Sequence, residues 1–158
     1  MLAVCPLTQA HRQWLRGEAQ RIFNGEIIVS RGVAHDVLSL PGFMAEDSGI
    51  PVGVAVYNIK DFQCELVSID AFVQWRGIGS ALIEAVKEAA VLAGSRRLWL
   101  ITTNDNVDAM RFYQKRGFKL KAVYPGSLAD SRLLKPQIPL VGNYGIAMSD
   151  EVELEMLL

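Results

Sequence analysis

The segment 42–73, GFMAEDSGIPVGVAVYNIKDFQCELVSIDAFV, constrains the fold of this chain most strongly. It contains three apolar or alternating runs, which are separated by Asp47-Ser48-Gly49 and by Lys60-Asp61. Both connections are short and made of residues that favour turns, and such turns join neighbouring antiparallel strands. The segment therefore predicts a three-stranded antiparallel meander in the middle of the chain.

A helix, a strand and a second helix are expected after the meander. Apolar residues recur at spacings of four and three from Ile78 to Leu92, which predicts an amphipathic helix that stops near Gly94. The run RRLWLITT, 96–103, is almost continuously apolar, as in a strand buried on both faces. In NVDAMRFYQKRGF, 106–118, Asn106 is a typical N-cap and Gly117 a typical stop, so this segment predicts the second helix.

The remaining segments give a strand and a helix at the start of the chain and two strands near its end. Segment 27–41 is mixed and carries the breaker Gly32, so we expect a loop with short helical pieces there. Segment 125–145 is rich in Pro and Gly and predicts a long connection with one helical turn at 128–134. The last run, DEVELEMLL, alternates apolar residues with glutamates, which predicts a closing strand with one solvated side. This order predicts one domain, 1–158, with a mixed sheet and helices on its faces.

Composition excludes several classes of protein. Hydrophobic residues make up 51% of the chain, charged residues 21%, and the formal net charge is -1. A disordered chain or a broad nucleic-acid surface is therefore not expected. The two cysteines, Cys5 and Cys64, are isolated and match no metal-ligand spacing, so no metal is predicted. The start of the chain has no secretion signal and no apolar run is long enough for a membrane span, so we expect a cytoplasmic protein without membrane contact.

The glycine pair in QWRGIGSAL, 74–82, has three interpretations. A dinucleotide fingerprint would need a third glycine where this chain has Leu82. A phosphate-binding P-loop would need a lysine after Gly79, where Ser80 stands. A tight turn explains the pair without any ligand. However, the pair lies at the start of a long helix, where free backbone N–H groups and the helix dipole attract anions.

Two motifs resemble those of the GNAT superfamily of acetyl-CoA-dependent N-acyltransferases. Gln74, Gly77 and Gly79 match the Q/R-x-x-G-x-G/A signature of the loop that binds the pyrophosphate of coenzyme A. The run 106–118 is similar to N-x-x-A-x-x-x-Y-x-K-x-G-F, with matches at Asn106, Ala109, Tyr113, Lys115, Gly117 and Phe118. The segment TTNDN and the tail that begins at LKPQIPL are similar to a bacterial subgroup without a firmly assigned substrate.

This resemblance implies an α+β fold with a central mixed, mostly antiparallel sheet of about six or seven strands and about four helices. It also implies that the strand before the glycine loop splays away from the next strand, so that backbone groups can pair with the pantetheine arm. In this strand Ala71 stands where many members have proline, so the bend depends on context. The residues expected to contact acetyl-CoA are Ile69, Ala71, Gln74, Trp75, Arg76, Gly77, Ile78, Gly79, Ser80, Asn104, Asn106 and Tyr113.

The resemblance assigns two roles near the thioester. The Ile69 N–H would face the thioester oxygen and stabilise its developing charge. Tyr113 would stabilise the leaving thiolate first and donate a proton second, because a phenol is a weaker acid than a thiol. Asn106 and Tyr113 are seven residues apart and so share one face of a helix. The structural alternative is that Asn106 only caps the helix and Tyr113 is a core aromatic.

The general base is expected on the strand before the glycine loop. Glu65 lies four residues before Ile69, and strand periodicity would place both side chains on one face. Glu65 is therefore the predicted base, with a solvated surface charge as the alternative, and His35 as a second candidate. Arg132 and Lys135 are surface cations or contacts to an acidic group of the acceptor.

The leading prediction is an N-acetyltransferase that joins acetyl-CoA and a primary amine in a ternary complex, because no nucleophile motif surrounds Cys64. A coenzyme-A-binding sensor or interaction module of the same fold is the alternative, and a dinucleotide-binding dehydrogenase is a weaker one. Segments 27–42 and 125–149 are expected to build the pocket for a small-molecule or peptide amine. The apolar face of the final strand suggests a homodimer.

Overall fold

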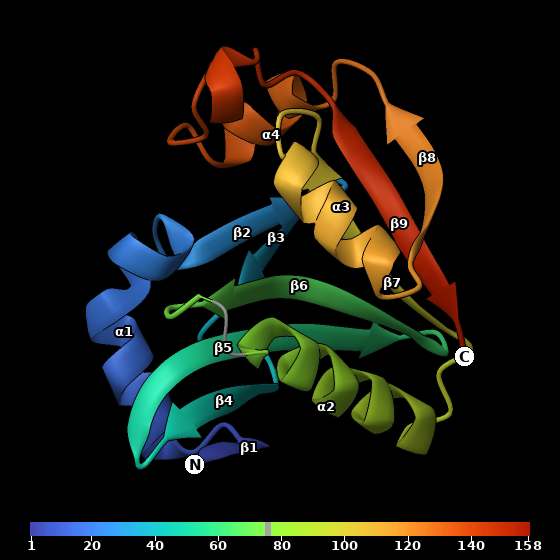
Figure 1. Cartoon of the computed structure of the whole chain (residues 1–158). Coiled ribbons are helices and arrows are strands. Elements are labelled where there is room, and N and C mark those ends of the chain that lie inside the picture. The colour runs from blue at the N-terminus through green and yellow to red at the C-terminus, as the bar shows by residue number, and fades with distance from the viewer. Residues whose placement is uncertain (75–76) are drawn as a thin grey trace.

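A computed structural model of the chain describes residues 1–74 and 77–158. Figure 1 shows a central sheet with helices on its faces and the amino terminus at one edge. The strands are β1 (Leu2–Pro6), β2 (Ile27–Ser30), β3 (Val33–Asp36), β4 (Gly42–Asp47), β5 (Ile50–Lys60), β6 (Gln63–Ala71), β7 (Arg97–Thr103), β8 (Lys119–Tyr124) and β9 (Glu151–Leu157). The helices are α1 (Gln9–Phe23), α2 (Ile78–Leu92), α3 (Val107–Lys115), α4 (Leu128–Leu134) and a short 3-10 turn (Asn143–Gly145).

The large sheet has seven strands in the order β1-β4-β5-β6-β7-β9-β8. Of these neighbours only β6 and β7 run parallel; the other described pairs are antiparallel. The predicted fold, a mixed and mostly antiparallel sheet with four helices, is confirmed. The meander is β4-β5-β6, and its first turn uses Ser48 and Gly49 with positive φ, as a two-residue hairpin requires.

Two cores form on the two faces of the sheet. On one face α2 packs against β4, β5 and β6, with Leu82, Val86 and Leu98 fully buried. On the other face α1 covers a second cluster that includes Leu15, Met44 and Val54. None of the helices in the described residues is long and apolar enough to cross a membrane.

The prediction of a loop with helical pieces at 27–41 is wrong. This segment contains the two-stranded hairpin β2-β3, which is drawn above β6 in Figure 1. Its two turn residues, Arg31 and Gly32, both have positive φ. Such a turn is usually marked by an Asn-Gly or Asp-Gly pair, and arginine rarely takes this conformation. The Arg-Gly pair of this chain therefore did not indicate a hairpin.

The final strand also differs from its prediction, although its existence is confirmed. β9 pairs with β7 on one side and β8 on the other, so it is an inner strand. Its apolar residues Val152 and Leu154 are buried, and so are Glu151 and Glu153. The glutamates are buried because arginines cover them, as in the 2.9 Å contact from Arg97 to Glu153. The expected solvated side is therefore absent, and the homodimer stays a prediction without that support.

The strands β6 and β7 separate part of the way along the sheet. They pair from Gln63 and Arg97 only as far as Glu65 and Trp99. Beyond this point β6 follows β5 to Ala71, and β7 follows β9 to Thr103. The expected splay between these strands is confirmed, and it opens a split through the sheet.

Candidate active site

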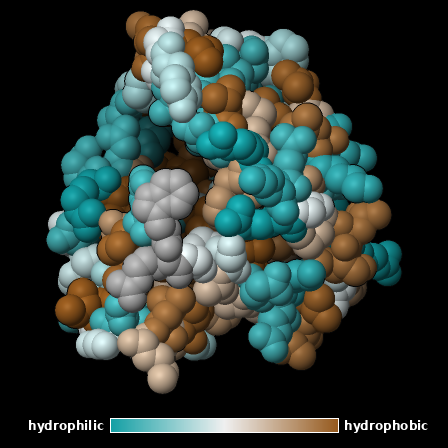
Figure 2. Space-filling model, in the orientation of Figure 1, coloured by the Kyte–Doolittle hydropathy of each residue, from teal (hydrophilic) through white to brown (hydrophobic). Residues whose placement is uncertain are grey.

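A cavity of about 460 Å³ lies at the split between β6 and β7. Figure 2 shows a hollow with apolar side chains inside it, between the region of α1 and that of α3. Its walls come from β6 and β7, from the end of α1, from β2, from α3 and from the connection before β9. Ile28 and Val29 of segment 27–42 and Ile138 and Met148 of segment 125–149 all line it. Both segments thus reach the cavity as predicted; their contact with an acceptor stays a prediction.

The backbone of Ile69 and Ala71 points into the split. Phe72 donates its N–H to Val52 at 2.8 Å, so the Val52–Phe72 pair is a hydrogen-bonded pair of the β5–β6 ladder. Hydrogen-bonded and open pairs alternate along an antiparallel ladder, and Ile69 and Ala71 occupy the open positions. Their N–H and C=O groups therefore face away from β5, towards the gap that β7 leaves. This is the orientation that a backbone role in binding the pantetheine arm would require.

A β-bulge in β6 overturns the expected placement of Glu65. Tyr57 is opposite Leu66 and Val56 is opposite Ser68, so Val67 is an extra residue in β6. One extra residue reverses the side-chain alternation. Ile69 consequently packs towards the core under α2, whereas the Glu65 side chain points to the opposite face. The prediction that the two side chains share one face is therefore wrong.

Glu65 joins the β2-β3 hairpin to the sheet. Its Oε1 accepts a hydrogen bond from the Ser30 hydroxyl at 2.5 Å, and its Oε2 lies 3.3 Å from Nε2 of His35. All three side chains are buried. Neither Glu65 nor His35 is among the described residues that line the cavity. The solvated alternative for Glu65 is therefore wrong, and its role as the base stays a prediction with no direct access to the cavity.

Asp70 is the carboxylate that sequence reasoning missed. It lines the cavity on the α1 side of the sheet, opposite Val54 in the β5–β6 register. Its Oδ2 accepts a hydrogen bond from the Ser68 hydroxyl at 3.1 Å. Burial raises the pKa of Asp70 to about 6, although the Ser68 bond and the charge of Arg21 lower it. The available signal was an acidic residue inside the apolar run SIDAFV.

Tyr113 lines the same cavity from α3. Its ring makes edge-on contacts with Phe112 and Phe118, which hold it in place. Burial raises the pKa of the Tyr113 phenol well above its usual range, and the charge of Asp70 adds to the effect. The phenol therefore keeps its proton and acts as a hydrogen-bond donor, which favours thiolate stabilisation over full proton transfer.

The two asparagines near α3 differ in what their side chains contact. Asn106 lines the cavity, and its Oδ1 also accepts from the N–H of Ala109 at 3.3 Å, so it caps α3 as expected. Asn104 donates to the Ala147 carbonyl and accepts from the N–H groups of Ser149 and Asp150. Both ends of this amide are engaged inside the protein, and the expected contact of Asn104 with acetyl-CoA stays a prediction.

Glycine is required at the two positions of the pair for different physical reasons. Gly77 is the N-cap of α2 in a left-handed conformation with φ of 68°, and a Cβ there would meet open space. At Gly79 a Cβ would lie 2.7 Å from the ring of Phe112, so this glycine lets α3 approach α2 closely. That packing role was not foreseen from the sequence. Gln74 is exposed, and Trp75 and Arg76, also expected to contact acetyl-CoA, lie outside the described residues.

The first turn of α2 has the features of an anion site. By helix geometry the N–H groups of Ile78, Gly79 and Ser80 have no partner within α2. The Ile78 side chain is buried in the core, so only its backbone is available. The Ser80 hydroxyl accepts from Nε of Arg116 at 2.8 Å, which ties α2 to α3. An open glycine followed by these N–H groups fits a pyrophosphate.

The cations of the long loop bind backbone carbonyls. Arg132 donates to the carbonyls of Ile138, Pro139 and Met148, and so orders the loop. Lys135 is buried and donates to the carbonyls of Phe23 and Ile27 at 3.0 and 2.6 Å. Neither side chain is a simple surface cation.

Three residues of types that bind metals, Cys5, His11 and Glu46, place one possible ligand atom each within 4.8 Å of the other two. However, the N–H of Thr8 donates to Nδ1 of His11, so the proton of the neutral ring is on Nε2. This Nε2 faces Glu46 Oε1 at 2.8 Å. The arrangement caps the start of α1, and a metal would have to displace that proton.

Comparison with known proteins agrees with this geometry. The family model described as "Acetyltransferase (GNAT) family" matches residues 9–118. The chain belongs to the GNAT acetyltransferase family. It is 43% identical over 128 residues to the uncharacterized protein YdhI of Bacillus subtilis, which covers 80% of this chain and 79% of that protein.

Solved structures of GNAT proteins share the fold. An IAA acetyltransferase from Bacillus cereus is similar with a TM-score of 0.76 and 21% identity, over 100% of both chains. A GNAT family acetyltransferase from Elizabethkingia anophelis with acetyl-CoA bound has a TM-score of 0.78 and 21% identity, over 99% of this chain and 98% of that one. At this identity the likeness concerns the fold of this GNAT protein.

Proposed function

We propose that this GNAT protein transfers the acetyl group of acetyl-CoA to a primary amine. The observation that carries the proposal is the Asp70 carboxylate in the split, next to the free backbone groups of Ile69 and in the same cavity as Tyr113. A carboxylate at this place attracts an ammonium group and can accept its proton. The acetyl-CoA bound to the Elizabethkingia anophelis structure supports the choice of cofactor.

The cofactor would be held by backbone groups at two places. The N–H groups at the start of α2, after Gly77, would bind its pyrophosphate. Ile69 and Ala71 would pair with the pantetheine arm, and Asn106, which faces the cavity, would contact the arm as well. Acetyl-CoA supplies the activated acyl group as a thioester. The Ile69 N–H would stabilise the charge that develops on the thioester oxygen.

Asp70 and Tyr113 divide the proton chemistry. The ammonium first gives one proton to Asp70, whose raised pKa of about 6 makes it a better base than an exposed aspartate. The neutral amine nitrogen then forms a bond to the acetyl carbon while the carbon–sulfur bond breaks, and the second proton that the nitrogen loses goes to the leaving thiolate, which departs as the thiol of coenzyme A. Tyr113 donates a hydrogen bond to the leaving thiolate. We keep Glu65 as an alternative base that would have to act through water.

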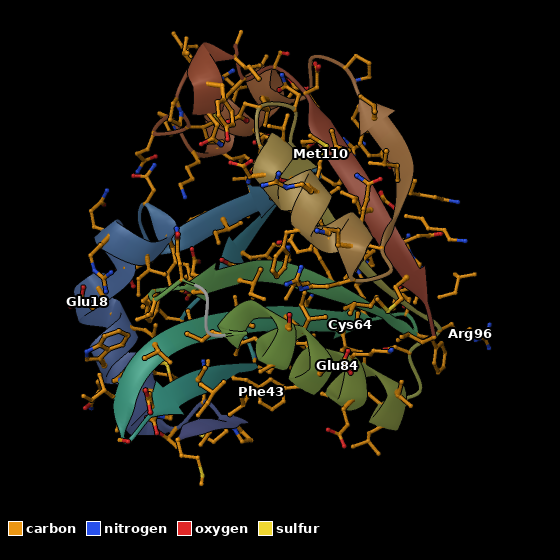
Figure 3. All side chains as sticks on the ribbon, viewed as in Figure 1. Glu18, Phe43, Cys64, Glu84, Arg96 and Met110 are labelled. Atoms are coloured by element: carbon orange, nitrogen blue, oxygen red, sulfur yellow. The ribbon has the colours of Figure 1, made fainter. Side chains whose placement is uncertain are left out.

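Direct attack by the amine is favoured over an acyl-enzyme. Cys64 is buried in the core next to α2, as Figure 3 shows, and it is not among the described residues that line the cavity. Burial raises the pKa of the Cys64 thiol to about 12, which leaves almost no thiolate at neutral pH. Cys5 lies on the edge strand β1, far from the split in the strand order.

Two measurements test the proposal. Isothermal titration with acetyl-CoA should show binding at micromolar to millimolar concentration, and thiol release should appear only when a primary amine is added. Absence of binding at millimolar acetyl-CoA would contradict the proposal. Binding without thiol release, across amines of different classes, would instead favour a coenzyme-A-binding sensor.

A further inference from the structure

The connection between α4 and β9, residues 135–150, forms a roof over the part of the cavity that the end of α1 and β2 line. On the α1 side, Lys135 is bonded to the carbonyls of Phe23 and Ile27, and the Asn24 amide donates to the Gln137 carbonyl at 3.4 Å. These contacts fix the first end of the roof to the end of α1 and to the start of β2.

On the α3 side the roof is fixed by a buried aspartate. Asp105 is 2% exposed, and its Oδ2 accepts from the backbone N–H and the side-chain amide of Asn143, at 2.9 and 3.0 Å. The Tyr144 hydroxyl donates to Asp108 in the first turn of α3 at 2.6 Å. With Asn104, these bonds attach the roof to the turn between β7 and α3. The roof therefore spans both walls of the cavity.

The cavity under this roof has about as much polar as apolar surface, and its apolar side chains gather on one side. At the end of α1, in β2 and in the roof these are Ile22, Phe23, Ile28, Val29, Ile138 and Pro139. Two carboxylates of the described residues line it, Asp70 and Glu151. Glu151 is neutralised by Arg31, which donates to it from both its backbone and its guanidinium group. The other carboxylate, Asp70, has no ion pair with any of the described residues.

We propose that the acceptor is a compact primary amine with an apolar body, and not the amino terminus or a lysine of a protein. Its ammonium would meet Asp70, and its apolar part would contact the walls under the roof. A peptide chain that continues beyond the reacting amine would have to pass where residues 135–150 join the two walls. This inference rests on the proposed function and names its substrate class.

A panel of acceptors tests the inference. Isoamylamine and phenethylamine represent compact apolar amines, spermidine a polar one, and an alanine-led hexapeptide the protein amino terminus. We expect kcat/KM for each apolar amine to be at least about tenfold higher than kcat/KM for spermidine or for the peptide. A peptide that is acetylated as fast as the apolar amines would overturn the inference and leave the proposed function intact.

Equilibrium binding of the same amines to the coenzyme-A-loaded protein separates the two proposals. Binding of the apolar amines without acetyl transfer would contradict the proposed function and keep the inference. If no amine binds and none is acetylated, both are wrong.

A matched pair of variants in the roof tests the apolar wall. Ile138 lines the cavity and Leu140, two residues later, is exposed and does not. Ile138→Asn should lower kcat/KM for phenethylamine at least about tenfold without changing the affinity for acetyl-CoA. Leu140→Asn should change it less than twofold. Equal effects of the two substitutions would contradict the proposal.

Discussion

Asp70 and Tyr113 line one cavity from different elements, β6 and α3, and the charge of Asp70 adds to the burial that raises the pKa of Tyr113. The two groups thus differ in protonation state at neutral pH. Asp70, with a pKa of about 6, is mostly ionised and can accept a proton, while Tyr113 keeps its own. Pairs of groups whose surroundings set different protonation states are typical of acid–base sites.

Asp70→Asn should lower kcat/KM by about 10²- to 10³-fold, because it removes the base and keeps the shape of the side chain. The wild type should lose activity as the pH falls through about 6, and the variant should not show this acid limb. Steady-state rates from pH 5 to 9 give both results. Glu65→Gln is the matched variant: if it removes the acid limb and Asp70→Asn does not, Glu65 is the base.

Asp70→Asn should also stabilise the protein at high pH. The pKa of Asp70 is raised by folding, so the native state binds the proton more tightly and stability falls as the pH rises through about 6. The variant has no charge at this position and so avoids the free-energy cost of the buried carboxylate. We expect its free energy of unfolding at pH 8 to exceed that of the wild type by at most about 3 kcal/mol.

Urea denaturation at several pH values measures this difference. It should shrink as the pH falls through about 6 and vanish below about 4, where both states are protonated. Asp130→Asn, at an exposed position of α4, should show no such dependence. A difference of constant size at every pH would show that the Asp70 charge has no cost in the folded protein.

Tyr113→Phe should lower kcat about 10²-fold and leave the affinity for acetyl-CoA unchanged, because only the donor to the thiolate is lost. The ring contacts with Phe112 and Phe118 remain, so thermal stability should stay within about 0.5 kcal/mol of the wild type. Tyr57→Phe, on the outer part of β5 and stacked on Phe43, is the control and should keep full activity. An unchanged kcat for Tyr113→Phe would remove the phenol from the mechanism.

Gly79→Ala should destabilise the protein by about 1–3 kcal/mol, because the new methyl group meets the Phe112 ring. Phe112→Leu in the same chain should recover part of this loss, and a double-mutant cycle of unfolding free energies measures the coupling. Gly17→Ala, in α1 with nothing within 4 Å, should be stabilising by up to about 1 kcal/mol. If both alanines have the same sign, the close approach of α2 and α3 is not what requires Gly79.

Local patterns determined much of the fold. The turn at Ser48 and Gly49, the spacing of apolar residues in α2 and the capping Asn106 act over a few residues, and all three were found where expected. Two motifs in the right order placed the start of α2 and the side of α3 that faces the split. These features follow from backbone geometry and short-range periodicity, which one sequence displays directly.

Tertiary structure decided the parts that set the chemistry. The extra Val67 reverses the faces of Glu65 and Ile69, and a bulge leaves no mark in a pattern of period two. Asp70 becomes a candidate base only because the folded chain buries it beside the split. Burial, register and the contact of distant segments depend on long-range packing. The sequence therefore determined the fold and the glycine loop, while the folded chain determined which carboxylate faces the cavity.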